Sequence, residues 1–298
     1  MHVDPLGDFF RNIQAVVGLA MLSLVVIIAV FAPKLSACPP DYYTGLIFNP
    51  PSYSHLLGTD SMGQDIWSRL LFGARTSLAV AVSVAFLSTA LSIFIGGTSA
   101  LIGGVYDSFW MRVVDAVLAV PSIIVMILVG AYLRPSLLLL ILMLSVLSWP
   151  GGARVMRSQI LSLKKRMHVS AARTFGAGWR HILANHILPE LGPLVTALMI
   201  QDARRAVFME AGLAFLGVSD PMMISWGKTM QQALAFTYLD VWKWWLVPTG
   251  LALSLTLIGL SFLSLSLEAA MDPRLNKSKQ LFKKSSKSAP GEFVHAKD

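Results

Sequence analysis

Long runs without a charged residue constrain this chain more than any other feature. An α-helix rises about 1.5 Å per residue, so about 20 apolar residues cross the hydrocarbon core of a bilayer. Uncharged runs of about this length occupy positions 13–32, 76–106, 116–133, 135–153 and 244–267. A sixth run, 191–218, is long enough but contains four charged residues. The sequence therefore predicts an all-α membrane protein with six transmembrane helices.

Composition supports this fold class. Only 13% of the residues are charged and 55% are hydrophobic, whereas soluble domains carry about 25% charged residues. A soluble chain with so little charge could not cover its core, but a chain embedded in lipid has no such need. The net charge of +8 is explained by basic segments beside the spans. Because no basic folded domain is present, we expect no nucleic-acid partner.

The distribution of Lys and Arg predicts the orientation. Seven basic residues and no acidic residue lie between positions 154 and 189, and basic flanks stay in the cytoplasm. The tail from position 271 carries seven further basic residues against three acidic ones. With six spans, the 154–189 loop and both termini would then share the cytoplasmic side. The tail 273–298 lacks apolar periodicity, which predicts disorder.

The segment SAARTFGAGWRHILANHILP (170–189) is the most patterned part of that basic loop. Apolar residues at helical spacing on both sides of Gly176 predict two short helices. Gly176 would allow a sharp turn between them, and Pro189 predicts a helix boundary at Leu188. The Ala171–Ala172 pair favours close approach to a partner protein. Two alternatives stay open from spacing alone: an ordinary basic loop, or an amphipathic pair on the inner leaflet.

This segment resembles the EAA loop of importer permeases in the ATP-binding-cassette superfamily. In that motif two alanines are followed by a glycine and a closing Leu-Pro at the spacing seen here, with Ser170 in place of the usual Glu. The resemblance implies a helix that couples the permease to an ATPase subunit. The positions that it assigns to this role are Ala171, Ala172, Arg173, Phe175, Gly176, Leu188 and Pro189.

Three further blocks are similar to the peptide and nickel permeases of that superfamily. They are GTDSMGQDIWSRLLFGARTSL (58–78), EAGLAFLGVSDPMMISWG (210–227) and the last span with its Asp-Pro-Arg ending (244–275). The long loop after the first span resembles that of the C-type subunit. The resemblance implies the type I permease fold of ATP-binding-cassette importers, in the inner membrane of a prokaryotic cell.

The same resemblance implies the partners and the activity. The partners would be a second homologous permease subunit, two ATP-binding subunits, an extracytoplasmic solute-binding protein and the lipid bilayer. The chain itself has no phosphate-binding loop of the GxxxxGK[ST] type, so ATP would be held by the partner ATPases and we expect no cofactor or enzymatic activity here. Di- and oligopeptides are the expected solutes, with nickel or a metal chelate as the alternative.

Charged residues inside the 191–218 run are a second candidate site. Ionisable groups within a span are costly and usually face an interior or a water-filled cavity. Asp202, Arg205 and Glu210, with Arg204 beside them, could line a translocation path. Alternatively, Asp202 and Arg205 are three residues apart and could form a structural ion pair. We expect no metal site.

These expectations divide the chain into three parts. Residues 1–75 would hold an N-terminal arm, the first span and a long outer loop, and residues 76–272 a five-helix permease core with the EAA loop at 158–190. Residues 273–298 would form the basic tail. A stand-alone channel or secondary transporter is the alternative of another class, but its expected inverted repeats are not evident in the sequence. An intramembrane enzyme would need paired catalytic groups that the pattern does not show.

Overall fold

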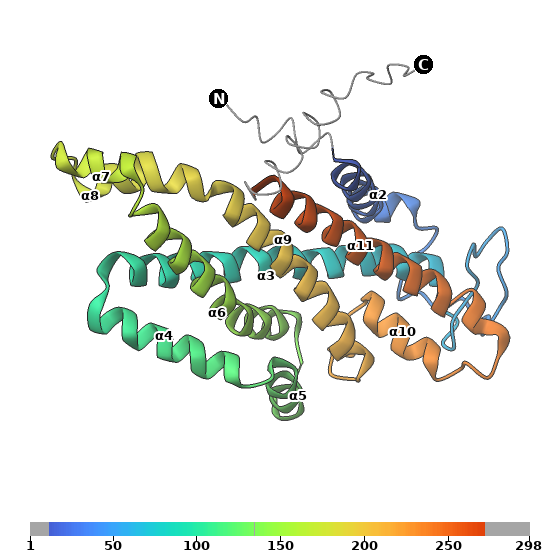
Figure 1. Cartoon of the computed structure of the whole chain (residues 1–298). Coiled ribbons are helices and arrows are strands. Elements are labelled where there is room, and N and C mark those ends of the chain that lie inside the picture. Colours follow the sequence, from blue (N-terminus) through green and yellow to red (C-terminus); the bar gives the residue numbers. More distant parts are fainter. Residues whose placement is uncertain (1–11, 134, 272–298) are drawn as a thin grey trace, which may run out of the picture.

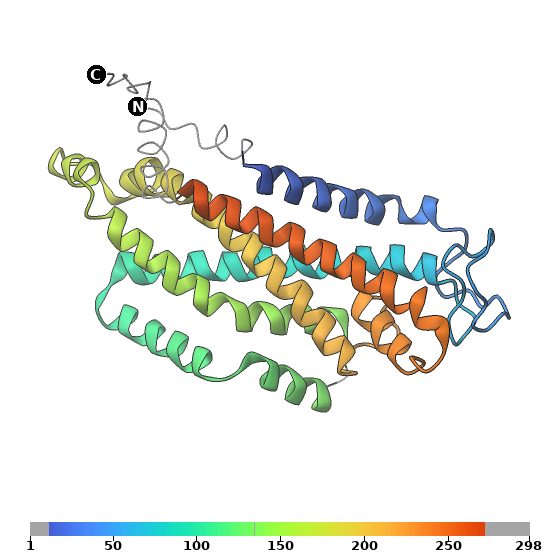
Figure 2. The same cartoon turned by 45° about the vertical axis from the view of Figure 1, so that its right-hand side comes forward.

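The computed structural model describes residues 12–133 and 135–271. Every uncharged run becomes helical, and Figures 1 and 2 show long helices lying side by side in one bundle. The helices are α2 (Ile13–Leu35), α3 (Ile66–Ile102), α4 (Gly104–Ala119), α5 (Ser122–Tyr132), α6 (Leu137–Leu163), α7 (Met167–Thr174), α8 (Trp179–Ile182), α9 (Leu188–Phe215), α10 (Trp226–Leu234) and α11 (Leu246–Met271). Helix α3 runs through the middle and packs against α2, α6, α9 and α10.

Four of the described helices are long and apolar enough to cross a membrane. The α4–α5 pair adds a fifth if it is counted as one broken span. Helix α9 has 28 residues, so its length suffices, but its charged residues lower its hydropathy. The chain is thus an all-helical membrane protein with four to five candidate spans.

The predicted third span, 116–133, is not one straight helix. Helix α4 ends at Ala119, and α5 leaves at 78° after Val120 and Pro121. Proline lacks an N–H and its ring collides with the preceding helical turn, and the residue before it is driven to extended backbone. Val120 is extended, at φ −96° and ψ 128°. The prediction of a continuous span was therefore wrong at this point.

The start of the second span was also predicted too late. Helix α3 begins at Ile66, ten residues before the predicted position 76, and continues without a break to Ile102. Asp65 caps it by accepting hydrogen bonds from the Ser68 amide at 2.8 Å and the Ser68 hydroxyl at 2.7 Å. The residues after Asp65 and the second span are therefore one element. Helix α3 ends at Ile102, where Gly103 and Gly104 both have positive φ.

Removing this cap gives a first prediction. Asp65→Ala is expected to lower the free energy of unfolding by about 1–2 kcal/mol, because two donors at the start of α3 lose their acceptor. The measurement is the thermal unfolding midpoint of the purified chain in detergent. Asp240→Ala is the matched control, since that side chain is 78% exposed and, among the described residues, pairs only with Lys243, which predicts a change within about 0.5 kcal/mol. Equal losses in both variants would contradict the assigned cap.

Small residues let the central helices approach closely. A Cβ added to Gly96 in α3 would lie 2.3 Å from the Ala153 carbonyl oxygen in α6. Ser92 of α3 donates a hydrogen bond to the Trp149 carbonyl of α6 at 2.8 Å. A Cβ added to Gly18 in α2 would likewise come too close to α11, at 2.8 Å from the Gly259 carbonyl oxygen. Because lipid tails are as apolar as leucine, such close packing and interhelical hydrogen bonds hold a membrane bundle together.

The two ends of the bundle differ. Helices α7 and α8 project at one end, together with the α3–α4 connection, while α10 and the loop 36–65 lie at the other end (Figure 2). Helix α6 continues ten residues past the predicted span end at 153, so the EAA loop predicted at 158–190 begins inside α6. Arg157 on this extension pairs with Asp107 of α4 through two contacts of 2.5 Å. The bidentate pair ties α6 to α4 near that end.

Candidate functional site

The α7–α8 hairpin, residues 167–182, is the first candidate site. Gly176 has φ +86°, a left-handed conformation that strains a residue with a Cβ. The amide of Ala177 donates to the Ala172 carbonyl at 3.0 Å and closes the end of α7. The predicted pattern of two short helices around Gly176 is therefore present.

One face of the hairpin is buried in the bundle. Val169 of α7 and Ile182 of α8 belong to a cluster of buried side chains that includes Met156 and Ile160 of α6 and Leu191 of α9. Burying such side chains gives about 1.5–3 kcal/mol each. The hairpin is therefore a packed extension of α6 and α9, and a force applied to it reaches both helices.

The opposite face is open to solvent. Phe175 is 90% exposed at the tip. Ala171 and Met167 are exposed beside it. Ala172, by contrast, is half-buried against the cluster of α6 and α9, so the alanine pair is shared between the two faces. Arg173 also lies on α7, but its side chain is outside the described part of the structure.

The predicted closing pair does not end a helix. Leu188 has helical φ and ψ of −58° and −43°, and a π-helical segment, Leu183–Ile187, joins α8 directly to α9. Pro189 stands in the first turn of α9, a position in which proline is common. The predicted boundary at Leu188 is therefore present as the change from the π-helical segment to α9, but the backbone stays helical across it. Leu188 and Pro189 are both exposed at the base of α9 rather than at the hairpin tip.

Charged and histidine side chains surround the first turn of α9. Glu190 of α9 pairs with Arg166, and its other carboxylate oxygen lies 3.2 Å from Nε2 of His168. The rings of His168 and His186 are 5.8 Å apart, and those of His181 and His186 are 5.9 Å apart. These contacts link the chain just before α7 to the first turn of α9, which fixes the angle at which the hairpin projects.

The acidic residues of α9 face the centre of the bundle. Asp202 is buried and accepts a 2.5 Å hydrogen bond from the Ser88 hydroxyl of α3. Glu210 is buried and accepts from the Ser77 hydroxyl at 3.2 Å. Among the described residues, no ion pair within 4 Å joins Asp202 to Arg205. Both carboxylates therefore attach α9 to α3. Asp202 does not form the alternative ion pair with Arg205.

The two arginines of α9 face cavities. Arg204 and Arg205 line an open cavity of about 340 Å³ between α9 and α11, the α9–α11 cavity. Arg205 also lines an open cavity of about 410 Å³, the α4–α6–α9 cavity, whose wall includes the break at Pro121. Phe208, one turn further along α9, lines both cavities. Of the three predicted path residues, only Arg205 thus borders open space.

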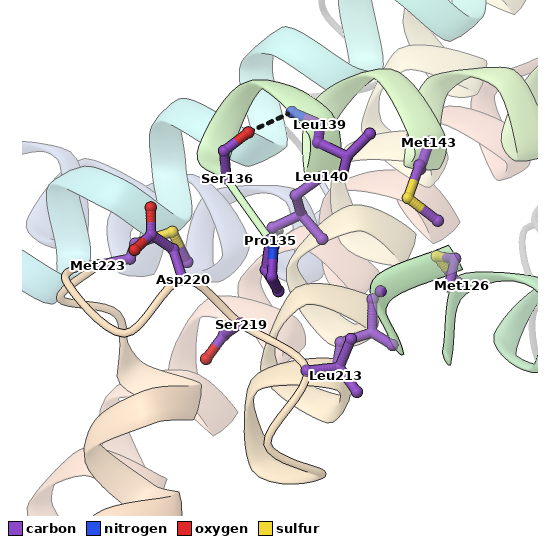
Figure 3. A pocket seen from close by; sticks show the side chains of 12 residues that line it. Met126, Pro135, Ser136, Leu139, Leu140, Met143, Leu213, Ser219, Asp220 and Met223 are labelled. Carbon is purple, nitrogen blue, oxygen red and sulfur yellow. Dashed lines mark hydrogen bonds between the residues drawn. The ribbon is translucent and has the colours of Figure 1, made fainter. Parts of the chain in front are cut away.

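A third cavity lies where α5 ends and α6 begins (Figure 3). Met126 of α5, Leu140 and Met143 of α6, and Leu213 of α9 give it an apolar lining. Ser136 is turned toward its own helix, where it caps α6 by accepting from the Leu139 amide at 3.2 Å. Its volume of about 20 Å³ holds roughly one water molecule, which is too little for a solute.

The signature block 58–78 contains a buried polar cluster whose role the sequence did not indicate. Asp60 accepts hydrogen bonds from the amides of Met62 and Gln64, both at 2.8 Å. Arg69 lies 3.7 Å from Asp60 and donates to the Gln232 side chain of α10 at 2.9 Å. Burial raises the pKa of Asp60, while the two amides and Arg69 oppose that shift. The cluster fastens the loop 36–65 to α3 and α10.

Comparison with known proteins gives two family matches. Residues 88–277 match the family described as binding-protein-dependent transport system inner membrane component. Residues 6–54 match the N-terminal TM domain of oligopeptide transport permease C.

Individual relatives extend over most of the chain. The oligopeptide transport system permease protein OppC of Bacillus subtilis is 34% identical over 279 residues, which cover 92% of this chain and 90% of the relative. A protein of Brucella suis, provisionally named a peptide permease, is 34% identical over 269 residues and 89% of each chain. A protein of Brucella abortus, provisionally named a peptide transport system permease, is 36% identical over 262 residues and 87% of each chain.

The matched family spans α6, the α7–α8 hairpin and α9 in one stretch, so the site described above lies within it. Membership implies that the chain works with the other subunits of a binding-protein-dependent importer and is its permease component, not its ATPase. The chain belongs to the family of binding-protein-dependent transport system inner membrane components and is a multi-pass protein of the inner membrane.

Proposed function

We propose that this chain is a permease subunit of an ATP-driven importer of di- and oligopeptides, and that its α7–α8 hairpin docks on an ATP-binding subunit. The supporting observation is the two-sided hairpin. Its inner face packs on α6 and α9, while Phe175 at the tip is 90% exposed. A rigid element that presents an aromatic anchor fits docking into a cleft of a partner protein.

The proposed coupling residues divide into four roles. Phe175 and Ala171, with Arg173 beside them, make the contact, while Ala172 holds α7 on the bundle. Gly176 sets the turn between the two helices. Leu188 and Pro189 form the base from which α9 continues. When the ATPase subunits close, the hairpin would carry the connected ends of α6 and α9 with it.

The proposed assembly contains a second homologous permease subunit, two ATP-binding subunits that hold the ATP, and an external solute-binding protein. This chain would contribute six spans, with α9 as the charged span and α4–α5 as one broken span. Both termini and the hairpin would lie in the cytoplasm. The basic flanks support this orientation.

A division of the chain at the outer loop is also proposed. Residues 1–75 form an N-terminal unit and 76–272 the permease core, although α3 itself crosses position 76. The two family matches support a junction, since one ends at residue 54 and the other begins at residue 88. The basic tail, 273–298, lies outside the described residues.

Peptides are the proposed solute because the relatives from Bacillus subtilis and Brucella are named for peptide transport. The cavities beside Arg205 and Phe208 are open and mixed in polarity, which suits a solute with both polar and apolar groups. Nickel, or a metal chelate, is the competing solute.

The test is reconstitution of the complete assembly in lipid. The chain is co-expressed with its partner permease, the two ATPases and the binding protein. ATP hydrolysis and uptake are then measured with peptides or with nickel complexes. We expect peptides to stimulate both activities. Stimulation by nickel complexes alone would replace the proposed solute, and purification of the chain with no associated ATPase would refute the proposed coupling role.

A further inference from the structure

The positive charge on α9 forms no close ion pair within the part of the chain that the structure describes. Arg205 makes no ion pair within 4 Å there, and Arg204 only donates to the Ser261 hydroxyl of α11 at 3.5 Å. The nearby carboxylate of Asp202 accepts its hydrogen bond from Ser88 and acts on Arg205 only through space. Two adjacent cations on one turn of helix therefore face a single carboxylate that forms no close ion pair with either, and this turn keeps a net positive charge.

Their position in the helix makes this charge costly. At about 1.5 Å per residue, Arg205 lies about 26 Å from the start of α9 and about 15 Å from its end. A guanidinium at that depth cannot face acyl chains without a large penalty, so it faces water or a polar partner. Arg205 is exposed and borders both open cavities. The charge is thus directed at the space through which a solute would pass.

The rest of the lining shows which solute this space favours. None of the described residues lining the two cavities is an Asp or a Glu. Gln201 and Ser261 add neutral hydrogen-bonding groups, and Phe208 adds an apolar ring. A guanidinium binds a carboxylate through two parallel hydrogen bonds. A metal cation would be repelled by the same wall.

We propose that Arg205, with Arg204 beside it, binds a carboxylate of the transported solute, so that the path favours solutes with a free carboxyl group. For a peptide this group is the C-terminal carboxylate. The proposal rests on the proposed function and deepens it, because it assigns a substrate group to a residue of the path. The competing occupant is a carboxylate of the second permease subunit.

The test uses the complete assembly in proteoliposomes and two forms of one peptide. One form ends in a free carboxylate and the other in a carboxamide, chosen so that the binding protein loads both equally. Uptake of each form is measured for the wild type, Arg205→Gln and Arg205→Lys. The readout is the ratio of free-acid to amide uptake within each sample, which is independent of how much assembly is present.

We expect Arg205→Gln to lower this ratio about fivefold, the effect of one ion pair in a water-accessible site. Arg205→Lys, which keeps the charge, should retain most of the ratio. Arg112→Gln is the matched control, because Arg112 is exposed on α4 outside both cavities, and its ratio should equal that of the wild type.

Three results would overturn the proposal. An unchanged ratio in Arg205→Gln would show that no solute carboxylate is bound there. An equal fall for both peptide forms would show that Arg205 pairs with the second permease subunit instead. A wild-type assembly that takes up neither form would refute the proposed peptide function itself, and this failure is distinguishable because it needs no variant.

Discussion

Gly176→Val is expected to lower ATP-driven uptake at least about tenfold while the chain still inserts and folds. Gly176 has φ +86° and no neighbouring atom near an added Cβ, so the cost comes from the backbone and not from a collision. A left-handed conformation costs about 1–2 kcal/mol in an ordinary residue and more in a β-branched one. The turn would relax to another shape and move Phe175 away from its proposed docking position. A loss of about 1.4 kcal/mol in the free energy of docking lowers the affinity for the ATP-binding subunit by a factor of ten.

Gly178→Val provides the matched control for that variant. Gly178 is exposed, has no positive φ and likewise has open space around an added Cβ. The measurements are uptake and ATP hydrolysis in proteoliposomes, normalised to assembled complex. Near-normal uptake in Gly176→Val, or equal losses in the two variants, would contradict the role assigned to the turn.

Gly96→Ala is expected to destabilise the bundle by about 3 kcal/mol, the upper part of the range for overpacked cores. The new Cβ would lie 2.3 Å from the Ala153 carbonyl oxygen and 3.0 Å from two further backbone atoms of that residue. Because backbone cannot rotate out of the way as a side chain can, α3 and α6 would have to separate. The loss would appear as a lower unfolding midpoint and less monodisperse protein in detergent.

At the neighbouring Gly97, the same substitution is expected to have the opposite effect on stability. A Cβ at Gly97 would meet only the Ile160 side chain, at an ordinary 3.8 Å. Alanine is favoured over glycine in a helix by up to about 1 kcal/mol, so Gly97→Ala should be neutral or slightly stabilising. If both variants lost the same stability, the close α3–α6 contact would be refuted.

The sequence predicted the helices of this fold better than their ends. Uncharged length alone located the helical runs, because the bilayer leaves few other ways to satisfy backbone hydrogen bonds. The break at Pro121 was missed because its neighbours on both sides are apolar enough for one span. The early start of α3 was missed because Arg69 and Arg75 interrupt the uncharged run, although Arg69 is buried in a polar cluster with Asp60.

The candidate site was predicted in outline but not in its division of roles. Helical spacing on both sides of Gly176 was sufficient to predict the hairpin. It could not show that Ala171 would be exposed and Ala172 half-buried, because that depends on the angle between α7 and the bundle. Similarly, the spacing of Asp202 and Arg205 allowed an ion pair, but the Ser88 hydroxyl of α3 satisfies Asp202. A partner from a distant helix cannot be read from local spacing.

The proposed docking site and the proposed solute site are connected by a single helix. The α7–α8 hairpin joins α9 through the π-helical segment, and α9 continues without interruption to Phe215 with Arg205 in its middle part. We infer that movement of the hairpin is transmitted along α9 to the cavities beside Arg205. The buried cluster that joins α7 and α8 to α6 and α9 gives this connection its stiffness.

Site-directed cross-linking tests the central claim most directly. The chain has one cysteine, Cys38, so Cys38→Ser combined with Phe175→Cys places a single thiol at the hairpin tip. A thiol-attached photo-cross-linker is activated in the complete assembly in lipid. The control is Tyr53→Cys, at a fully exposed position in the loop 36–65. The account predicts a cross-link from position 175 to an ATP-binding subunit and none from position 53. No cross-link to that subunit from position 175, or one from position 53, would contradict it.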